Sequence, residues 1–171
     1  MCQLETRPTE ESPASEYRNG LAERAAALPA EIDHDGGISM MAETHLRILI
    51  VDDQALVRRA VRLMLESHAG WKVCGEAADG IEAIDRTREL HPDIVIMDLS
   101  MPKMDGLEAT REIHASFPET QILILTLHHF PNLVKAVQHA GAQGCVLKSD
   151  SNRYLIPAVS SLSKSQPFFA A

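Results

Sequence analysis

Side chains that can do chemistry stand at the ends of short apolar runs in this sequence. Three are aspartates, one is a threonine and one is a lysine: Asp52, Asp53, Asp98, Thr126 and Lys148. A short apolar run bounded by loop-forming residues is typical of a buried strand. An ionisable carboxylate at the end of such a strand is costly unless something outside the strand uses it.

These side-chain types together fit one kind of chemistry. Mg²⁺ binds few carboxylates and keeps several waters, so Asp52, Asp53 and Asp98 suit it as ligands. Without a cation, three carboxylates in one cleft would repel one another. Lys148 offers a compact positive charge for a phosphoryl group, and Thr126 offers a hydroxyl. The set predicts a transiently phosphorylated aspartate, Asp98.

Each feature alone has an ordinary explanation. An aspartate pair after a strand more often caps a helix, and a threonine or lysine at a strand end is usually a plain strand or surface residue. The joint occurrence of these residues at the ends of four predicted strands favours the chemical interpretation.

The elements that must position these residues alternate along the chain. Strands are predicted at 47–51, 72–77, 93–98, 121–127 and 144–147. Helices are predicted at 55–66, 80–90, 106–117, 133–140 and about 152–162. Such alternation indicates a parallel sheet covered by helices on both faces. The carboxyl ends of its strands share one edge, where open α/β folds place their chemistry.

Residues 1–44 differ in composition from the rest of the chain. They hold nine acidic and three basic residues, and so carry −6 of the formal charge of −8. They are rich in Glu, Pro, Ser, Ala and Gly, which predicts a disordered acidic extension. Met40 and Met41 directly precede the first strand, so a start codon at one of them is an equal alternative.

Charge and cysteine content exclude several classes of protein. No basic stripe is present, so we expect no nucleic-acid binding by this chain alone. The three cysteines show no paired or metal-binding spacing, which favours a reducing compartment. No apolar run approaches the roughly 18 residues of a membrane span, and no signal peptide is visible, so we expect a cytoplasmic protein with no membrane contact.

Four segments together resemble the receiver domain of bacterial two-component response regulators. They are Ile48–Asp53, Asp93–Gly106, Ile124–Thr126 and Gly144–Lys148. Lys148-Ser149-Asp150 resembles the NarL/LuxR-type subgroup, in which a helix-turn-helix DNA-binding domain normally follows. The resemblance implies a flavodoxin-like, doubly wound α/β fold with a five-stranded parallel sheet in the order 2-1-3-4-5. It places the receiver domain at 45–165 and a C-terminal tail at 166–171, with the DNA-binding domain absent.

The resemblance also implies roles for the residues. Asp98 is the expected phosphoacceptor, Thr126 moves to bond the phosphoryl group, and Lys148 pairs with it. The expected partners are a sensor histidine kinase and, on phosphorylation, a second copy of the chain. The signal is expected to leave through the face formed by the helix at 133–140, the strand at 144–147 and the last helix. Cys145 departs from the family, which usually has Tyr or Phe there as a rotameric switch.

Asp52 and Asp53 are the expected Mg²⁺ ligands, with the backbone carbonyl of Ser100 as a further one. By the same resemblance Ser100 and His128 flank the path of the water that removes the phosphoryl group. A receiver of this kind promotes its own phosphorylation and dephosphorylation but is a signalling domain, not a conventional enzyme.

Two other functions fit parts of the pattern less well. A phosphatase of the haloacid dehalogenase type would need a second aspartate two residues after the nucleophile, where Ser100 stands. A nucleotide-binding flavodoxin-like module would need a glycine-rich loop after the first strand, and residues 51–55 provide none. Whether the chain is a stand-alone receiver or a fragment of a transcription regulator stays open from the sequence.

Overall fold

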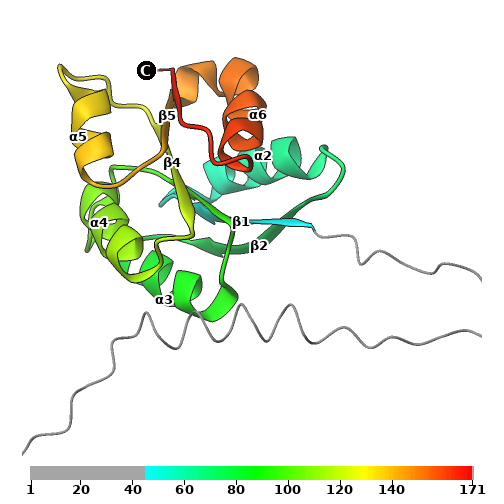
Figure 1. Ribbon diagram of the computed structural model, residues 1–171, viewed down its shortest axis with the longest axis horizontal. Helices are drawn as coiled ribbons and strands as arrows, with labels where there is room; N and C mark the ends of the chain where they lie inside the picture. Colours follow the sequence, from blue (N-terminus) through cyan, green and yellow to red (C-terminus); the bar gives the residue numbers. More distant parts are fainter. Residues whose placement is uncertain (1–44, 171) are drawn as a thin grey trace, which may run out of the picture. The chain divides into compact units, whose positions relative to one another are not determined.

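Parallel strands alternate with helices along residues 45–170, the part of the chain that the computed structural model describes (Figure 1). The strands are β1 (Leu46–Val51), β2 (Trp71–Ala77), β3 (Ile94–Met97), β4 (Gln121–Thr126), β5 (Gly144–Leu147) and β6 (Phe168–Ala170). The helices are α2 (Ala55–Glu66), α3 (Gly80–Leu90), α4 (Gly106–Ser116), α5 (Leu133–His139) and α6 (Ser151–Leu162), with a 3₁₀ turn η1 (Lys148–Asp150) before the last. The predicted extension at 1–44 lies outside the described residues.

The strand order is β2-β1-β3-β4-β5-β6, and every neighbouring pair is parallel. The predicted flavodoxin-like fold and the order of its first five strands are therefore confirmed. The predicted strand number was one too few. Residues 168–170, which we expected in a C-terminal tail, add β6 to the outer edge of β5, with Phe168 opposite Gly144.

The sixth strand gave no signal in the sequence because it has only three residues and follows Pro167. Tertiary contacts hold it in place. Phe168 packs against the buried cluster of the sheet, and its ring lies 6.2 Å from the ring of Tyr154 in α6. Its backbone N–H donates to the carbonyl of Gln143 at 3.0 Å.

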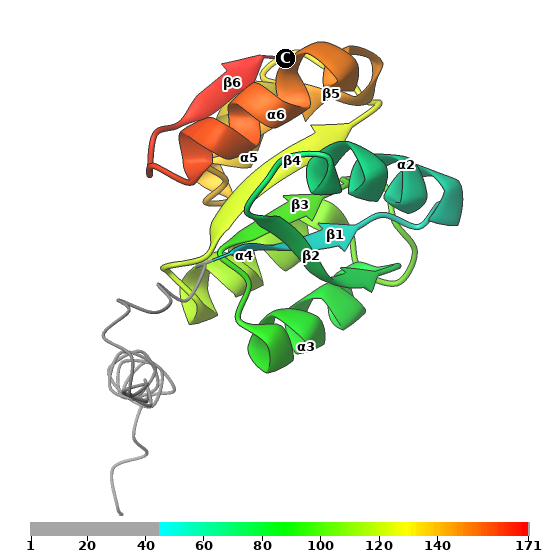
Figure 2. The ribbon, with the colours of Figure 1, turned by 90° about the vertical axis from the view of Figure 1, so that its right-hand side faces the viewer.

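Helices cover both faces of the sheet, as the alternation predicted. Figures 1 and 2 show α2 and α6 on one face, and α3, α4 and α5 on the other. The core between the sheet and α2 and α6 is apolar throughout, and its largest fully buried members include Ile48, Ile50, Ile94, Ile96, Leu65, Leu123 and Leu155. Because both faces are buried, β3 and β4 have almost no polar residue before their carboxyl ends. These rigid strands hold the residues that follow them.

Two helices begin with aspartate caps close to the carboxyl edge of the sheet. Asp79 Oδ1 accepts the N–H of Glu82 at 2.9 Å, and Asp105 Oδ1 accepts the N–H of Glu108 at 2.8 Å. Caps of this kind stabilise a helix by about 1 kcal/mol each. Each cap hydrogen bond therefore fixes the end of the preceding loop to the first turn of its helix.

The helices in the described part of the chain are short. The longest two, α2 and α6, have 12 residues each. Among residues 45–170 no helix combines the length and the apolar character needed to cross a membrane.

Candidate functional site

The end of β3 places Asp98 at the carboxyl edge of the sheet. All four residues of β3 are buried, and Asp98 itself is 4% exposed. Its backbone N–H donates to the carbonyl of Val51 at 2.9 Å, so the pairing of β3 with β1 continues past the strand end. Its Oδ1 accepts the N–H of Leu99 at 2.8 Å. The carboxylate is therefore held in one orientation.

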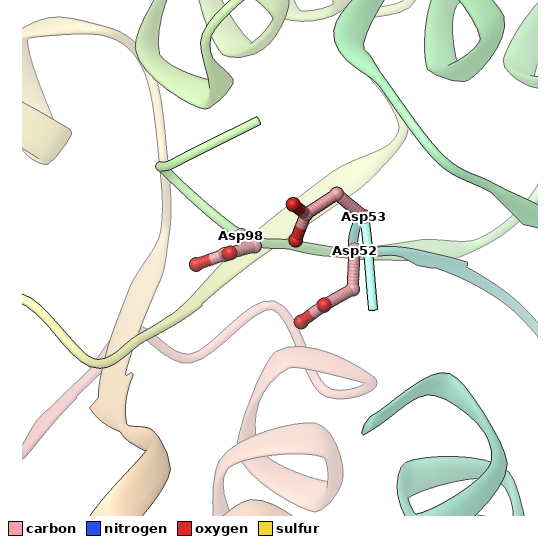
Figure 3. A group of neighbouring side chains, drawn as sticks. All are labelled: Asp52, Asp53 and Asp98. Atoms are coloured by element: carbon pink, nitrogen blue, oxygen red, sulfur yellow. The ribbon is translucent and has the colours of Figure 1, made fainter. Parts of the chain in front are cut away.

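Asp52 and Asp53 follow the neighbouring strand β1, and their carboxylates share a common space with that of Asp98 (Figure 3). Carboxylate oxygens of the three residues lie within 4.8 Å of one another. Asp52 is buried, whereas Asp53 is exposed. The Oδ1 of Asp52 accepts the N–H of Gln54 at 2.9 Å, which fixes its side chain. The structure thus brings together three aspartates that are 46 residues apart at the extremes of the sequence.

Lys148 reaches this cluster from the end of β5. Its Nζ lies 2.6 Å from Oδ2 of Asp52 and 3.0 Å from Oδ2 of Asp98, and its side chain is only 9% exposed. Burial alone would lower the pKa of Lys148. The hydrogen bonds and negative charges of Asp52 and Asp98 outweigh burial and raise this pKa, so the amine stays charged. One ammonium therefore contacts two of the three carboxylates.

Thr126 is the last residue of β4 and is fully buried. It pairs in register with Leu147, so it lies beside the residue that precedes Lys148. Its hydroxyl oxygen accepts the backbone N–H of His128 at 3.1 Å. Thr126 therefore joins the strand ends at the site to the loop that follows β4.

A hollow of about 520 Å³ opens beside the strand ends. Its lining comes from the β3–α4 loop, the start of α4 and the β4–α5 loop: Leu99, Ser100, Met101, Asp105, Leu107, His128 and Phe130. Ser100 and His128, the two residues expected to flank the path of the attacking water, line the same hollow. Ser100 and His128 come from different loops, so they line one hollow only because the fold brings these loops together.

The loop between β3 and α4 is closed tightly on itself. Gly106 donates its N–H to the carbonyl of Leu99 at 3.0 Å, and a Cβ at Gly106 would collide with the carbonyl oxygen of Asp98. Only glycine permits this close approach. The loop is also held from outside, because Nζ of Lys103 lies 2.6 Å from Oδ2 of the buried Asp79. That lysine lowers the pKa of Asp79, first through its hydrogen bond.

Four charged residues next to the site were missed in the sequence. Arg58 and Glu76 form an ion pair at 2.8 Å behind Asp52, and Lys103 pairs with Asp79. The partners of Arg58 and Lys103 are 18 and 24 residues away in the sequence, so local spacing does not reveal these pairs. The only local signal was Asp79 before Gly80, which is typical of a helix cap.

Cys145 occupies the centre of β5 and has no exposed surface. Its register partners are Ile124 in β4 and Phe169 in β6. Burial raises the pKa of its thiol to about 11. The resemblance implies an aromatic residue at this position, where the structure has a small, uncharged, buried thiol.

The donor set of the cluster suits a hard divalent cation. Oxygen ligands from two or three carboxylates, with one of them exposed to solvent, leave room for the waters that Mg²⁺ retains. The excess of three carboxylates over one ammonium also favours a cation there.

Comparisons with known proteins agree with this geometry. The model of the response regulator receiver domain family matches residues 48–160. The response regulator UvrY of Escherichia coli (strain K12) is 39% identical over 126 residues, which cover 74% of this chain and 58% of UvrY. The chain therefore spans less than two thirds of this curated relative.

Two solved structures share the fold. A crystal structure of a LuxR-family two-component response regulator from Aurantimonas sp. SI85-9A1 matches with a TM-score of 0.70 and 38% identity, over 72% of this chain and 89% of that one. The isolated REC domain of RcsB from Salmonella enterica serovar Typhimurium, determined with the phosphomimetic BeF3-, matches with a TM-score of 0.69 and 30% identity, over 74% and 94%.

Proposed function

The chain belongs to the response regulator receiver family, in its NarL/LuxR-type subgroup, and from this premise we propose that Asp98 accepts a phosphoryl group from the phosphohistidine of a sensor kinase. The observation that carries the proposal is the position of Lys148, whose Nζ contacts both Asp52 and Asp98. An ammonium 3.0 Å from the attacking carboxylate can neutralise charge that arrives with the phosphoryl group.

The transfer itself needs little from the protein beyond placement. An oxygen of Asp98 attacks phosphorus, the P–N bond of the donor breaks, and its electron pair returns to the donor imidazole. The Leu99 N–H and Lys148 hold the two carboxylate oxygens in place for this attack. The Thr126 hydroxyl, at the end of β4, can then donate to a phosphoryl oxygen.

Asp52 and Asp53, with Asp98 and the backbone carbonyl of Ser100, would hold Mg²⁺ in this proposal. The bound ion would neutralise negative charge on the phosphoryl oxygens. The chain would in this way promote its own phosphorylation and dephosphorylation while remaining a signalling protein. Incubation with acetyl phosphate and Mg²⁺, followed by intact mass, tests the proposal directly: one added phosphoryl group is expected.

Replacing Asp53 tests the metal part of the proposal. Asp53→Ala is expected to slow labelling by acetyl phosphate more than about a hundredfold even in excess Mg²⁺, because charge stabilisation by a metal amounts to several kcal/mol. Chelation of the wild type should have the same effect. Asp85→Ala, on the exposed face of α3, is the control and should label normally. Labelling of Asp53→Ala at the wild-type rate would remove Asp53 from the site.

His128 and Ser100 are proposed to set how long the phosphoryl group lasts, since both line the hollow beside the strand ends. His128→Ala is expected to change the dephosphorylation rate, because its side chain lines the same hollow as Ser100. His129→Ala is the matched control, because it is the adjacent exposed histidine and does not line the hollow. A dephosphorylation rate equal to that of the wild type would leave His128 without a role in this step.

The output is proposed to pass through the face formed by α5, β5 and α6, as a homodimer that forms on phosphorylation. Thr126 and Lys148 both adjoin β5, so a shift there reaches α6 through η1. Sedimentation with and without beryllofluoride should show an increase in mass for the wild type and none for Asp98→Asn. An unchanged wild-type mass would count against this route.

The curated relatives extend beyond the length that this chain matches. We propose that the receiver at 45–165 acts as the input part of a transcription regulator, in which DNA binding belongs to a separate domain. The cytoplasm is the proposed location, since a phosphorylated kinase domain must reach Asp98.

A further inference from the structure

Arg58, in the first turn of α2, links three parts of the structure behind the acidic cluster. Its Nη1 donates to the backbone carbonyl of Asp52 at 2.7 Å. Its Nε donates to Oε2 of Glu76 in β2 at 2.8 Å. The side chain is only 17% exposed, so this arrangement lies largely inside the fold.

Asp52 is held by each of its polar groups. Its N–H donates to the carbonyl of Ala77 at 3.1 Å, its Oδ1 accepts from Gln54, and its Oδ2 contacts Lys148. Its backbone carbonyl accepts from Arg58. That carbonyl belongs to the peptide unit that leads into Asp53, and this unit is planar and stiff. A bond to the carbonyl therefore fixes the direction from which Asp53 leaves the strand.

Glu76 holds the guanidinium through Nε, whereas the bond to Asp52 comes from Nη1. Its second oxygen, Oε1, accepts from Nη2 of Arg62 at 2.7 Å. Burial would raise the pKa of Glu76, but the hydrogen bonds and charges of Arg58 and Arg62 outweigh it and lower this pKa. Glu76 is therefore ionised at neutral pH, and the charge of Arg58 is already partnered.

We propose that Arg58 is a positioning residue for divalent-cation binding, acting on the peptide between Asp52 and Asp53. This inference rests on the metal site of the proposed function. The geometry needs two donors of one planar group, one for Glu76 and one for the Asp52 carbonyl. Lysine has the same charge but lacks this fork, so it cannot replace arginine here.

The test is the affinity for Mn²⁺, used as a probe of the site and measured by electron paramagnetic resonance of the free ion. Both Arg58→Ala and Arg58→Lys are expected to weaken Mn²⁺ binding about tenfold or more, as loss of a group that orients metal ligands commonly does. Arg62→Ala and Arg62→Lys are the matched controls. Arg62 lies one turn further along α2 and binds the same glutamate, but it makes no contact with Asp52.

The outcomes separate positioning from charge. If Arg58 acted only as a nearby positive charge, Arg58→Ala would tighten Mn²⁺ binding and Arg58→Lys would leave it unchanged, which would overturn the proposal. Equal weakening in the Arg58 and Arg62 variants would overturn it too, because it would reflect general loosening of α2. Thermal unfolding of each variant shows whether it is folded during the measurement. Absence of Mn²⁺ binding by the wild type would instead refute the metal site itself, and the inference with it.

Discussion

Asp98→Asn is expected to show no added phosphoryl mass after treatment with acetyl phosphate and Mg²⁺, under conditions that label the wild type once. The amide cannot supply the carboxylate oxygen that bonds to phosphorus. We also expect the variant to stay folded. The change removes one of three crowded negative charges and leaves Lys148 its closer contact, at 2.6 Å, with Asp52. Intact mass, repeated with a phosphorylated kinase domain as donor, measures the effect.

Asp85→Asn provides the control for the chemistry of the substitution itself. This residue lies on the exposed surface of α3, where its carboxylate pairs with Arg88 at 3.0 Å. It should label as the wild type does. Equal labelling of Asp98→Asn and the wild type would remove Asp98 as the acceptor, and peptide mapping would then show which side chain takes the group.

Lys148→Met is expected to destabilise the fold by about 3 kcal/mol or more without divalent cations, because it leaves two buried carboxylates without their cation. Excess Mg²⁺ should recover much of the loss. A ligand at a hundred times its dissociation constant stabilises a folded state by about 2.7 kcal/mol. Urea unfolding with and without Mg²⁺ measures both effects. The variant should also lose rapid labelling at Asp98.

Lys103→Met is the matched control for this variant. Its ion pair with Asp79 has the same 2.6 Å distance, but the lysine side chain is 66% exposed. Exposed pairs contribute little to stability, because water and salt screen their charges. Similar losses of unfolding free energy in the two variants would show that burial of Lys148 does not make its ion pairs more stabilising than an exposed one.

The pH dependence of the Lys148 contribution follows from the direction of its shift. The folded-state pKa lies above the ordinary value of 10.5, so the contribution is complete below pH 10.5 and is lost as pH rises through the folded-state value. The stability difference between wild type and Lys148→Met should therefore be nearly constant from about pH 6 to 9. Any large change inside that range would have to come from other groups.

Regular elements were predictable wherever local signals agreed. The bounds of α2 and α3 are those expected from apolar spacing and, at the end of α3, from Pro92 after Leu90. Gly141 ends α5 with a φ of +98°, as its position after the helix suggested. The meeting of Asp52, Asp98 and Lys148 was also predictable, because parallel strands place their carboxyl ends at one edge.

Features that depend on tertiary contacts were not predictable in this way. β6 has too few residues for any periodicity, and it forms because Phe168 has Tyr154 and the sheet to pack against. The contacts of Arg58 depend on how α2 packs against β2, which apolar spacing does not specify. Ser100 and His128 line one hollow because of the paths of two loops, which the sequence pattern does not specify either.

The buried thiol of Cys145 offers a chemical probe of local opening in the fold. A thiol with no exposed surface and a pKa of about 11 cannot react with an alkylating reagent from the closed state at neutral pH. Its rate of alkylation therefore reports how often a local opening exposes the thiol, and yields the free energy of that opening. Since β5 leads directly into Lys148, the same rate would report whether phosphorylation tightens or loosens the strand.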